Sequence, residues 1–251
     1  MAKPLYDIPY LEKLQVLLAA LKQRSLELLE IKKGDVIADI GCGTGADAAA
    51  IAKMGAKVYG FDHNPEMITA SKQQKAEGLN IEFIQSDAAN IPLPSGSVDK
   101  ILFDRVFQHL DDYNAVLQEA YRILKPGGQL QIIDPDHFSF TLFLADIELE
   151  RKLLDNISYK RIPNSYRVRQ IPQFLEKNGF KTQLTEIHNY LVKDYNLATS
   201  IIRFEKVVNE EYAEGNIREE ELNNWYSLKA QSSEGFNFSM NMMMFSAIKN
   251  A

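Results

Sequence analysis

An acidic residue and several glycines are concentrated in one short turn near the start of the chain. Asp39 precedes Gly41 and Gly43, and this turn lies between an apolar run at 36–40 and an Ala-rich run at 46–54. Glycines between a strand and a helix let the backbone approach a ligand closely, and the helix N-terminus offers free N–H groups. The turn also fits the dinucleotide fingerprint, and a tight turn without any ligand is a further alternative.

A second acidic residue follows the next apolar run. Asp62 comes directly after residues 57–61, which are typical of a buried strand. A carboxylate at that place can accept hydrogen bonds from both hydroxyls of a ribose. It can instead cap the helix that begins near Pro65. The ribose interpretation fits a nicotinamide cofactor and other adenosine ligands equally.

Further features separate these ligands. The carboxylate of Asp39 is unfavourable beside a pyrophosphate and favourable beside an ammonium group. Asp87, together with the backbone N–H of Ala88, follows a third predicted strand and can bind the amino group and a ring nitrogen of adenine. The three acidic residues therefore favour an adenosine ligand that carries an amine and no phosphate, which is S-adenosylmethionine.

The elements that must position these residues alternate between strand and helix patterns, which is typical of a doubly wound parallel α/β sheet. The predicted strands are residues 36–40, 57–61, 81–85, 98–103, 129–134, 180–190 and 236–249. The predicted helices are most of the first 30 residues and residues 46–54, 65–77, 111–124, 138–156, 171–178 and 197–228.

The order and spacing of these pieces resemble the class I S-adenosylmethionine-dependent methyltransferases. The nearest branch is the small-molecule branch typified by ubiquinone and menaquinone biosynthesis methyltransferases. The segments that carry the resemblance are residues 36–45 (VIADIGCGTG), 60–67 (GFDHNPEM), 86–88, 91–94, 97–99, 104–110 and 119–128. The resemblance covers roughly residues 36–136, and it implies a Rossmann-like seven-stranded sheet whose last strand is antiparallel.

The resemblance also implies roles for individual residues. Gly41 and Gly43 would pass the methionine part of the cofactor, and Asp39 would orient its amine. Asp62 would hold the ribose. The other implied cofactor-binding residues are His63 and Met67 near the adenine and ribose, Asp87 and Ala88 at the adenine amino group, and Asp104 and Arg105 at the methionine end.

The chain is expected to form a single methyltransferase domain over residues 1–251. Its parts are N-terminal helices at 1–35, a cofactor-binding core at 36–136, helical additions at 137–169 and 193–232, and final strands at 180–190 and 236–249. The additions follow the carboxyl ends of strands, where doubly wound folds place ligands. We therefore expect them to form a lid over the methyl acceptor.

Methyl transfer from a sulfonium needs proximity and orientation, and a general base only where the acceptor must lose a proton early. His109 and His137 are the candidate bases, although His109 can instead pack against or cap a helix and His137 can be a loop residue. Phe138 and Phe143 could form an apolar wall for an aromatic or lipid-like acceptor. Arg169, in a basic stretch, could pair with an acidic acceptor or lie in a solvated loop.

Two other functional classes stay open. The cofactor motifs fit a protein that binds S-adenosylmethionine without transferring its methyl group, and the glycine turn alone fits a nicotinamide-dependent oxidoreductase. Discrimination between these classes requires binding and product measurements.

Composition limits the partners of this chain. It has 251 residues and a formal net charge of −6, so bulk attraction to nucleic acid is not expected. The single cysteine, Cys42, favours a reducing compartment, and without a signal-peptide pattern or an apolar run of membrane-spanning length the sequence predicts a cytoplasmic protein. The four histidines and the cysteine lack zinc-ligand spacing, so no metal site is expected.

Overall fold

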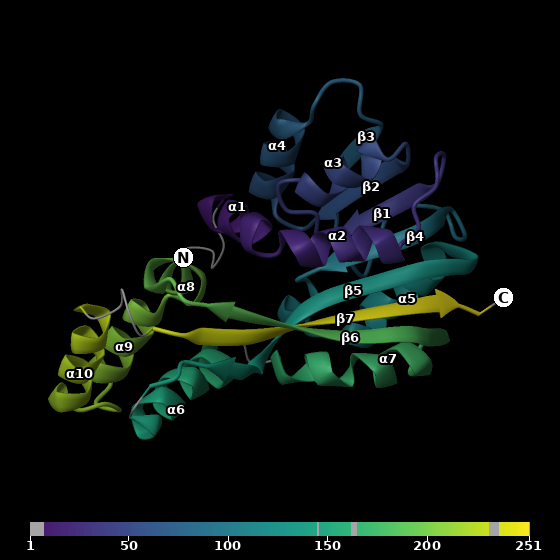
Figure 1. Cartoon of the computed structure of the whole chain (residues 1–251). Coiled ribbons are helices and arrows are strands. Elements are labelled where there is room, and N and C mark those ends of the chain that lie inside the picture. Colours follow the sequence, from purple (N-terminus) through teal and green to yellow (C-terminus); the bar gives the residue numbers. More distant parts are fainter. Residues whose placement is uncertain (1–7, 145, 162–164, 231–235, 251) are drawn as a thin grey trace. The chain divides into compact units, whose positions relative to one another are not determined.

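The computed structural model describes residues 8–144, 146–161, 165–230 and 236–250. These residues form a seven-stranded sheet in the order β3-β2-β1-β4-β5-β7-β6, in which β7 runs antiparallel to its neighbours (Figure 1). The strands are β1 (Val36–Ile40), β2 (Lys57–Asp62), β3 (Ile81–Gln85), β4 (Val98–Asp104), β5 (Leu124–Thr141), β6 (Phe180–Val192) and β7 (Phe238–Lys249). The predicted doubly wound sheet with an antiparallel last strand is confirmed.

The helices largely occupy the predicted segments. They are α1 (Ile8–Leu17), α2 (Ala19–Leu28), α3 (Ala46–Lys53), α4 (Pro65–Gln74), α5 (Tyr113–Ile123), α6 (Ile147–Asp155), α7 (Ile171–Lys177), α8 (Tyr195–Ile202), α9 (Phe204–Ala213) and α10 (Glu219–Ala230). Short helical turns are η1 (Phe107–His109), η2 (Asn156–Arg161) and η3 (Ser165–Gln170). None of the helices that the structure describes is long and apolar enough to cross a membrane.

The chain divides into two compact units. The first takes in the described residues within 1–17, 135–168 and 187–242, and the second those within 18–134, 169–186 and 243–251. The second unit contains β1 to β4 and the part of β5 that precedes Pro135. The first unit draws on nearly the same segments as the predicted additions, and their role as a lid stays a prediction.

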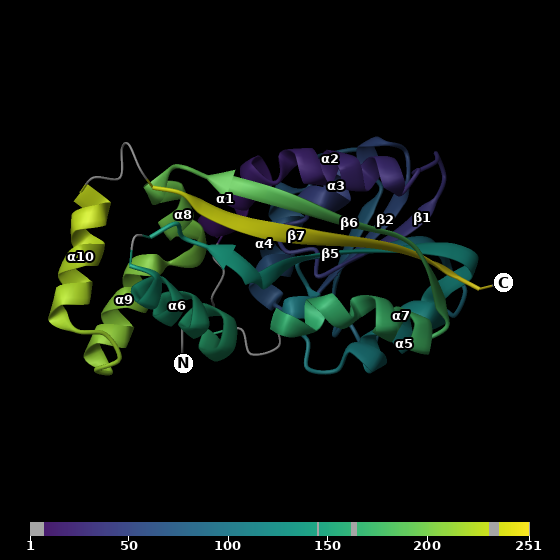
Figure 2. The ribbon, with the colours of Figure 1, turned by 60° about the horizontal axis from the view of Figure 1, so that its bottom comes forward.

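In the second unit, helices cover both faces of a buried parallel sheet. Figure 2 shows α2 and α3 on one face, and α5 and α7 on the other. The strand β1 is buried over four of its five residues, as expected for a parallel strand covered on both sides. In its register with β2, Asp39 lies opposite Gly60, so the glycine turn and the end of β2 emerge at the same edge.

Helix starts in this unit are fixed by polar side chains. The Asn64 side chain accepts a hydrogen bond from the N–H of Glu66 (2.8 Å), and Pro65 occupies the first turn of α4. Asn64, and not Asp62, is thus the cap of α4. The Asp112 carboxylate caps α5 by accepting from the N–H groups of Asn114 and Ala115.

The first unit is held by an aromatic core. Trp225, Phe204 and Phe238 are almost completely buried, and the Phe204 ring lies 5.8 Å from the Trp225 ring and 5.4 Å from that of Phe238. The helix α1 packs against α8, and α9 packs against α10. Phe238 brings the start of β7 into this core.

Two predicted helices are corrected by the structure. Residues 138–141 continue β5, and the helix predicted from 138 begins only at Ile147. The period there is two, because Phe140 is buried while Ser139 faces the next strand and accepts a hydrogen bond from the N–H of Asn241 (2.8 Å). The segment 197–228 is three helices, since Arg203 adopts a left-handed conformation (φ 58°) between α8 and α9.

Candidate cofactor site

The glycine turn after β1 is fixed by the backbone of β2 and by close packing. The N–H groups of Gly41 and Cys42 both donate to the carbonyl oxygen of Phe61, at 2.7 and 2.9 Å. Gly41 has φ +79°, and a Cβ atom at this position would lie 2.3 Å from Cγ2 of Val106. Both the backbone conformation and the available space therefore require glycine here.

Asp62 connects the end of β2 to this turn. Its carboxylate accepts hydrogen bonds from the N–H of Gly43 (2.9 Å) and from the N–H of Asn64 (2.9 Å). The residue is 9% exposed, and a carboxylate has lone pairs for further donors. Asp62 thus shapes the turn and remains able to accept hydrogen bonds from a ribose. Nearby, His63 is exposed and Met67 is buried.

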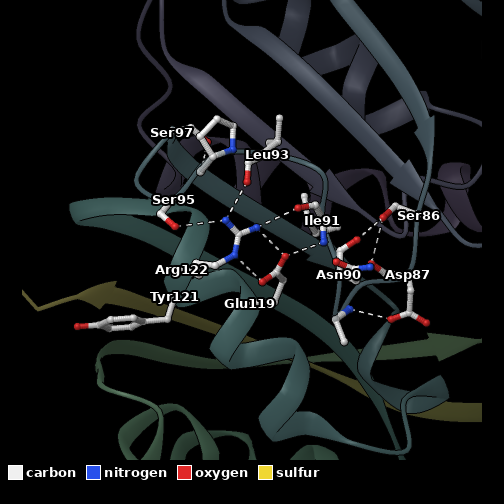
Figure 3. A network of polar contacts seen from close by, with 12 residues as sticks. Ser86, Asp87, Asn90, Ile91, Leu93, Ser95, Ser97, Glu119, Tyr121 and Arg122 are labelled. Carbon is white, nitrogen blue, oxygen red and sulfur yellow. Dashed lines mark hydrogen bonds and ion pairs between the residues drawn. The ribbon is translucent and has the colours of Figure 1, made fainter.

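The loop after β3 brings Asp87 to the same edge of the sheet. The N–H of Ser86 donates to the main-chain oxygen of Asp62 (3.0 Å), which places the start of the loop beside the end of β2. Asp87 is exposed, and one of its carboxylate oxygens accepts from the N–H of Ala89 (2.8 Å; Figure 3). The structure thus places Asp62, Asp87 and Ala88 near the carboxyl end of β3.

A buried cluster of charges lies at the end of β4. Lys22, from α2, donates to the carboxylates of Asp47 (2.5 Å) and Asp104, and the guanidinium of Arg105 lies 3.1 Å from Asp104. Although burial opposes ionisation, Arg105 and Lys22 lower the pKa of Asp104. Burial lowers the pKa of Lys22, but the charges of Asp104 and Asp47 outweigh it, so the pKa is raised. Lys22 and Asp104 are therefore ionised at neutral pH, whereas burial raises the pKa of Asp47.

Asp39 differs from the other carboxylates of this cluster in its hydrogen bonding. Its side chain is buried, and its Oδ2 atom has no hydrogen-bond partner among the residues that the structure describes. Burial, followed by the negative charge of Asp47, raises the pKa of Asp39 well above its usual range. A buried acceptor without a donor is costly, so this oxygen fits a donor that arrives with a ligand, best of all a cation.

Lys22 and Asp134 were missed by sequence reasoning. Lys22 lies in a helix that was noted only for its leucines, so nothing in its local pattern indicated the site. Asp134, at the end of the predicted fifth strand, accepts hydrogen bonds from the N–H groups of Phe107 (3.0 Å) and Gln108 (3.2 Å). It thereby fixes the turn η1 that carries His109, and burial raises its pKa to about 7.

His109 lies on the turn after β4. Partial desolvation of its ring, followed by the positive charges of His63 and Arg105, lowers its pKa to about 4. An imidazole with this pKa is neutral at pH 7 and can accept a proton. Its place in the second unit is compatible with the predicted role, which the structure does not test.

The remaining predicted residues are described within their own units. His137, Phe138 and Phe143 belong to the first unit, where His137 is buried against Phe140 and Phe138 contacts Tyr159 edge-on at 4.8 Å. Phe143 is 58% exposed, and Arg169 is exposed on η3. Within the described residues, no group of three or more His, Cys, Asp or Glu side chains is arranged to hold a metal ion.

Comparison with known proteins identifies the fold family. Residues 38–132 match the model of the methyltransferase domain family, and this range contains Asp39, the glycine turn, Asp62 and Asp87. A demethylmenaquinone methyltransferase from Thermus thermophilus is 35% identical over 117 residues, which are 45% of this chain and 53% of that protein. Residues 38–132 belong to the class I S-adenosylmethionine-dependent methyltransferases.

Two further comparisons cover more of the chain. An uncharacterized 37.1 kDa protein in transposon TN4556 of Streptomyces fradiae is 32% identical over 179 residues, covering 69% of this chain and 52% of that protein. The crystal structure of the YcgJ protein from Bacillus subtilis has the same fold, with a TM-score of 0.67, 17% identity and coverage of 93% and 99% of the two chains. The methyltransferase spans about half the length of the curated relatives that it matches.

The residues of this methyltransferase fit the family's cofactor. S-adenosylmethionine carries an ammonium group, a ribose and an adenine. The unpartnered Asp39 oxygen suits the ammonium, and the open lone pairs of Asp62 suit the ribose hydroxyls. A pyrophosphate has no donor to offer the buried Asp39 oxygen, so this geometry favours the ammonium group of S-adenosylmethionine over a nicotinamide dinucleotide.

Proposed function

We propose that this chain transfers the methyl group of S-adenosylmethionine to the oxygen, nitrogen or carbon atom of a small-molecule acceptor. The observation that carries the proposal is the buried Asp39 oxygen without a donor, at the end of β1 and beside a turn that admits only glycine at position 41. A cationic amine on an adenosine ligand satisfies that oxygen, and the methyltransferase domain supplies the expected context.

In this proposal each residue holds one part of the cofactor. Asp39 accepts from the α-ammonium group, and Asp62 accepts from the ribose hydroxyls. The remaining contacts are Gly41, Gly43, Asp104 and Arg105 at the methionine end, His63 and Met67 beside the ribose and adenine, and Asp87 with Ala88 at the adenine amino group.

The bound cofactor supplies an activated methyl group on a sulfonium, so the protein contributes mainly proximity and orientation. His109 is the favoured general base, because it lies on the turn after the carboxyl end of β4, where doubly wound folds place ligands. Its lowered pKa leaves the ring neutral at pH 7 and makes it a weaker base than an ordinary imidazole. His137 is the second candidate, from the first unit. An acceptor that already has a free lone pair needs neither residue.

The acceptor is proposed to be aromatic or lipid-like. The support is the aromatic side chains of the first unit, where Phe138 contacts Tyr159 and Phe143 is exposed. The relatives named demethylmenaquinone methyltransferases favour the same class, although their match covers under half of this chain. Residues 137–169 and 193–232 would then bind the acceptor, with Arg169 available for an acidic group. The single cysteine supports a cytoplasmic location.

Binding calorimetry tests the cofactor assignment. Wild-type protein is expected to bind S-adenosylhomocysteine and not NAD. Asp39→Asn should weaken S-adenosylhomocysteine binding by about ten- to a hundredfold, since it removes a charged partner of the α-ammonium. Its affinity for 5′-methylthioadenosine, which lacks the ammonium, should change little. NAD binding in place of S-adenosylhomocysteine would overturn the proposal in favour of an oxidoreductase.

The pH dependence of transfer tests His109. If His109 accepts a proton from the acceptor, kcat/KM should stay level between pH 6 and 8 and fall only below about pH 5, because the ring protonates near pH 4. His109→Gln should abolish that acidic limb and lower kcat. A profile that falls near pH 6.5, or an unchanged one in His109→Gln, would rule out His109 as the base.

Mass spectrometry of an acceptor panel separates transfer from binding alone. The panel should include quinols, phenols, amines and carboxylates, each incubated with S-adenosylmethionine. A product heavier by one methylene unit supports the transferase. Tight cofactor binding with no product from any acceptor would favour the second candidate, a protein that binds the cofactor without transferring its methyl group.

A further inference from the structure

The loop that joins β3 to β4 is held by hydrogen bonds from one arginine of α5. The guanidinium of Arg122 donates through Nη2 to the main-chain oxygen of Ile91 (2.9 Å) and through Nη1 to that of Leu93 (2.8 Å). The same group pairs with Glu119, one turn earlier on α5, with Nε 2.7 Å from Oε2 (Figure 3). The planar fork of arginine makes such multiple bonds directional.

Glu119 also binds the backbone of Ile91. Its Oε1 atom accepts the N–H of Ile91 at 2.6 Å and also bonds Nη2 of Arg122 at 2.7 Å. Both backbone polar groups of Ile91 are thus satisfied by one ion pair, which does for this residue what a neighbouring strand does in a sheet. The pair therefore fixes the path of the backbone.

The Arg122–Glu119 pair is connected to Asp87 by a short series of hydrogen bonds. The hydroxyl of Ser86 donates to the main-chain oxygen of Asn90 (2.6 Å), and the N–H of Asn90 donates to that of Asp87 (3.0 Å). Residues 86–90 are thus tied to Asp62 at one end, through the N–H of Ser86, and to α5 at the other, through Ile91.

We infer that Arg122, with Glu119, is a positioning residue that fixes the Asp87 carboxylate and so sets the preference of the site for a purine with a 6-amino group. The inference rests on the proposed function, in which Asp87 accepts from that amino group. Asp87 itself is exposed on a polar loop, so its placement depends on what restrains the loop. Arg122 acts through the loop and does not touch the cofactor.

The experiment compares two ligands that differ at the purine 6-position, where an oxo group replaces the amino group, and in the proton that N1 then carries. S-adenosylhomocysteine and S-inosylhomocysteine are titrated into the full-length wild-type protein and into Arg122→Ala and Arg122→Lys, and the ratio of the two Kd values is the readout. We expect wild-type protein to prefer S-adenosylhomocysteine by about ten- to a hundredfold, the range of one hydrogen bond to a charged group. Arg122→Ala should reduce this preference to within about threefold. Arg122→Lys should give an intermediate ratio.

Arg24→Ala is the matched control. Arg24 also lies on a helix and pairs with a glutamate, Glu186, at 2.7 Å, but among the described residues its hydrogen bonds and ion pairs go to Glu186 and Glu27, outside the β3–β4 loop. Its substitution should leave the ratio unchanged. A purely structural role of Arg122 would weaken both ligands equally, and that result would overturn the inference while leaving the proposed function intact. Failure of the wild-type protein to bind S-adenosylhomocysteine would overturn the proposed function itself. If Arg122→Ala does not fold, the ratio in Arg122→Lys decides.

Discussion

Gly41→Ala is expected to destabilise the protein by about 2–5 kcal/mol and to remove most of its affinity for S-adenosylhomocysteine. Alanine in the left-handed conformation costs about 1–2 kcal/mol. The new Cβ would also lie 2.3 Å from Cγ2 of Val106, and relieving such an overlap in a packed region typically costs about 1–3 kcal/mol. Because domains of this kind are stable by only about 5–15 kcal/mol, urea denaturation should show a large decrease in midpoint.

Gly78→Ala separates the two contributions. Gly78 has φ +80°, nearly the value of Gly41, but a Cβ there would meet no atom within 4 Å. It should therefore show the conformational cost alone, about 1–2 kcal/mol, with unchanged ligand affinity. In the Gly41→Ala/Val106→Ala double variant the overlapping methyl group is gone, so part of the stability should return. Equal losses in Gly41→Ala and Gly78→Ala would contradict the packing argument.

The glycine turn was predictable because its constraint is local in sequence. The strand before Gly41, the helix after it and the acidic residues at strand ends lie within short windows, and parallel strands bring their carboxyl ends to one edge of the sheet. Asp39, Asp62 and Asp87 accordingly lie at strand ends on this edge, and their roles in cofactor binding stay predictions. The steric reason for glycine at position 41 could not be predicted from the sequence, because the Val106 side chain is 65 positions away along the chain.

The groups that support the site were not predictable from local pattern. Lys22 reaches Asp104 from a helix 82 positions earlier, and Arg122 binds loop residues 29 and 31 positions before it. Both are charged residues on helices, and such residues usually face solvent. Only the tertiary structure shows that Lys22 is largely buried and that Arg122, with a side chain 37% exposed, is bonded to a loop. The same limit applied to residues 138–141, where the Phe-rich composition suggested a helix although the alternation fits a strand.

Lys22→Met is expected to cost about 3–5 kcal/mol at pH 7, the usual loss when one partner of a buried ion pair is removed. The side chains of Lys22 and Asp104 are 12% and 6% exposed, so water cannot replace the lost cation. Methionine is of similar length and favours a helix, so α2 itself should persist. The variant should also bind S-adenosylhomocysteine less tightly, because Asp104 lies at the proposed methionine end of the site.

The pH dependence of this loss distinguishes a charge effect from a packing effect. In the wild-type protein the pKa of Asp104 is lowered, so its contribution is present above about pH 4 and is lost as the pH falls further. In Lys22→Met the pKa of Asp104 in the folded state should rise above its value in the unfolded state. The folded variant then binds more protons than the unfolded variant between about pH 4 and 7. The free energy of unfolding of the variant should therefore fall as pH rises over this range. The difference between wild-type and variant stabilities should therefore shrink as pH falls from 7 to 4, and should shrink further below pH 4 as Asp104 of the wild type becomes protonated. A loss that is constant with pH would indicate packing alone.

Lys125→Met provides the comparison that completes this argument. Lys125 also pairs with an aspartate, Asp99, at 2.7 Å, but the two side chains are 43% and 30% exposed. Water can hydrate either partner after the substitution, so the loss should stay below about 1 kcal/mol and vary little with pH. The difference between the two lysine variants then measures what burial adds to the pair. Asp47→Asn combined with Lys22→Met should recover part of the stability, since Asp47 loses its lysine partner whereas Asp104 keeps Arg105.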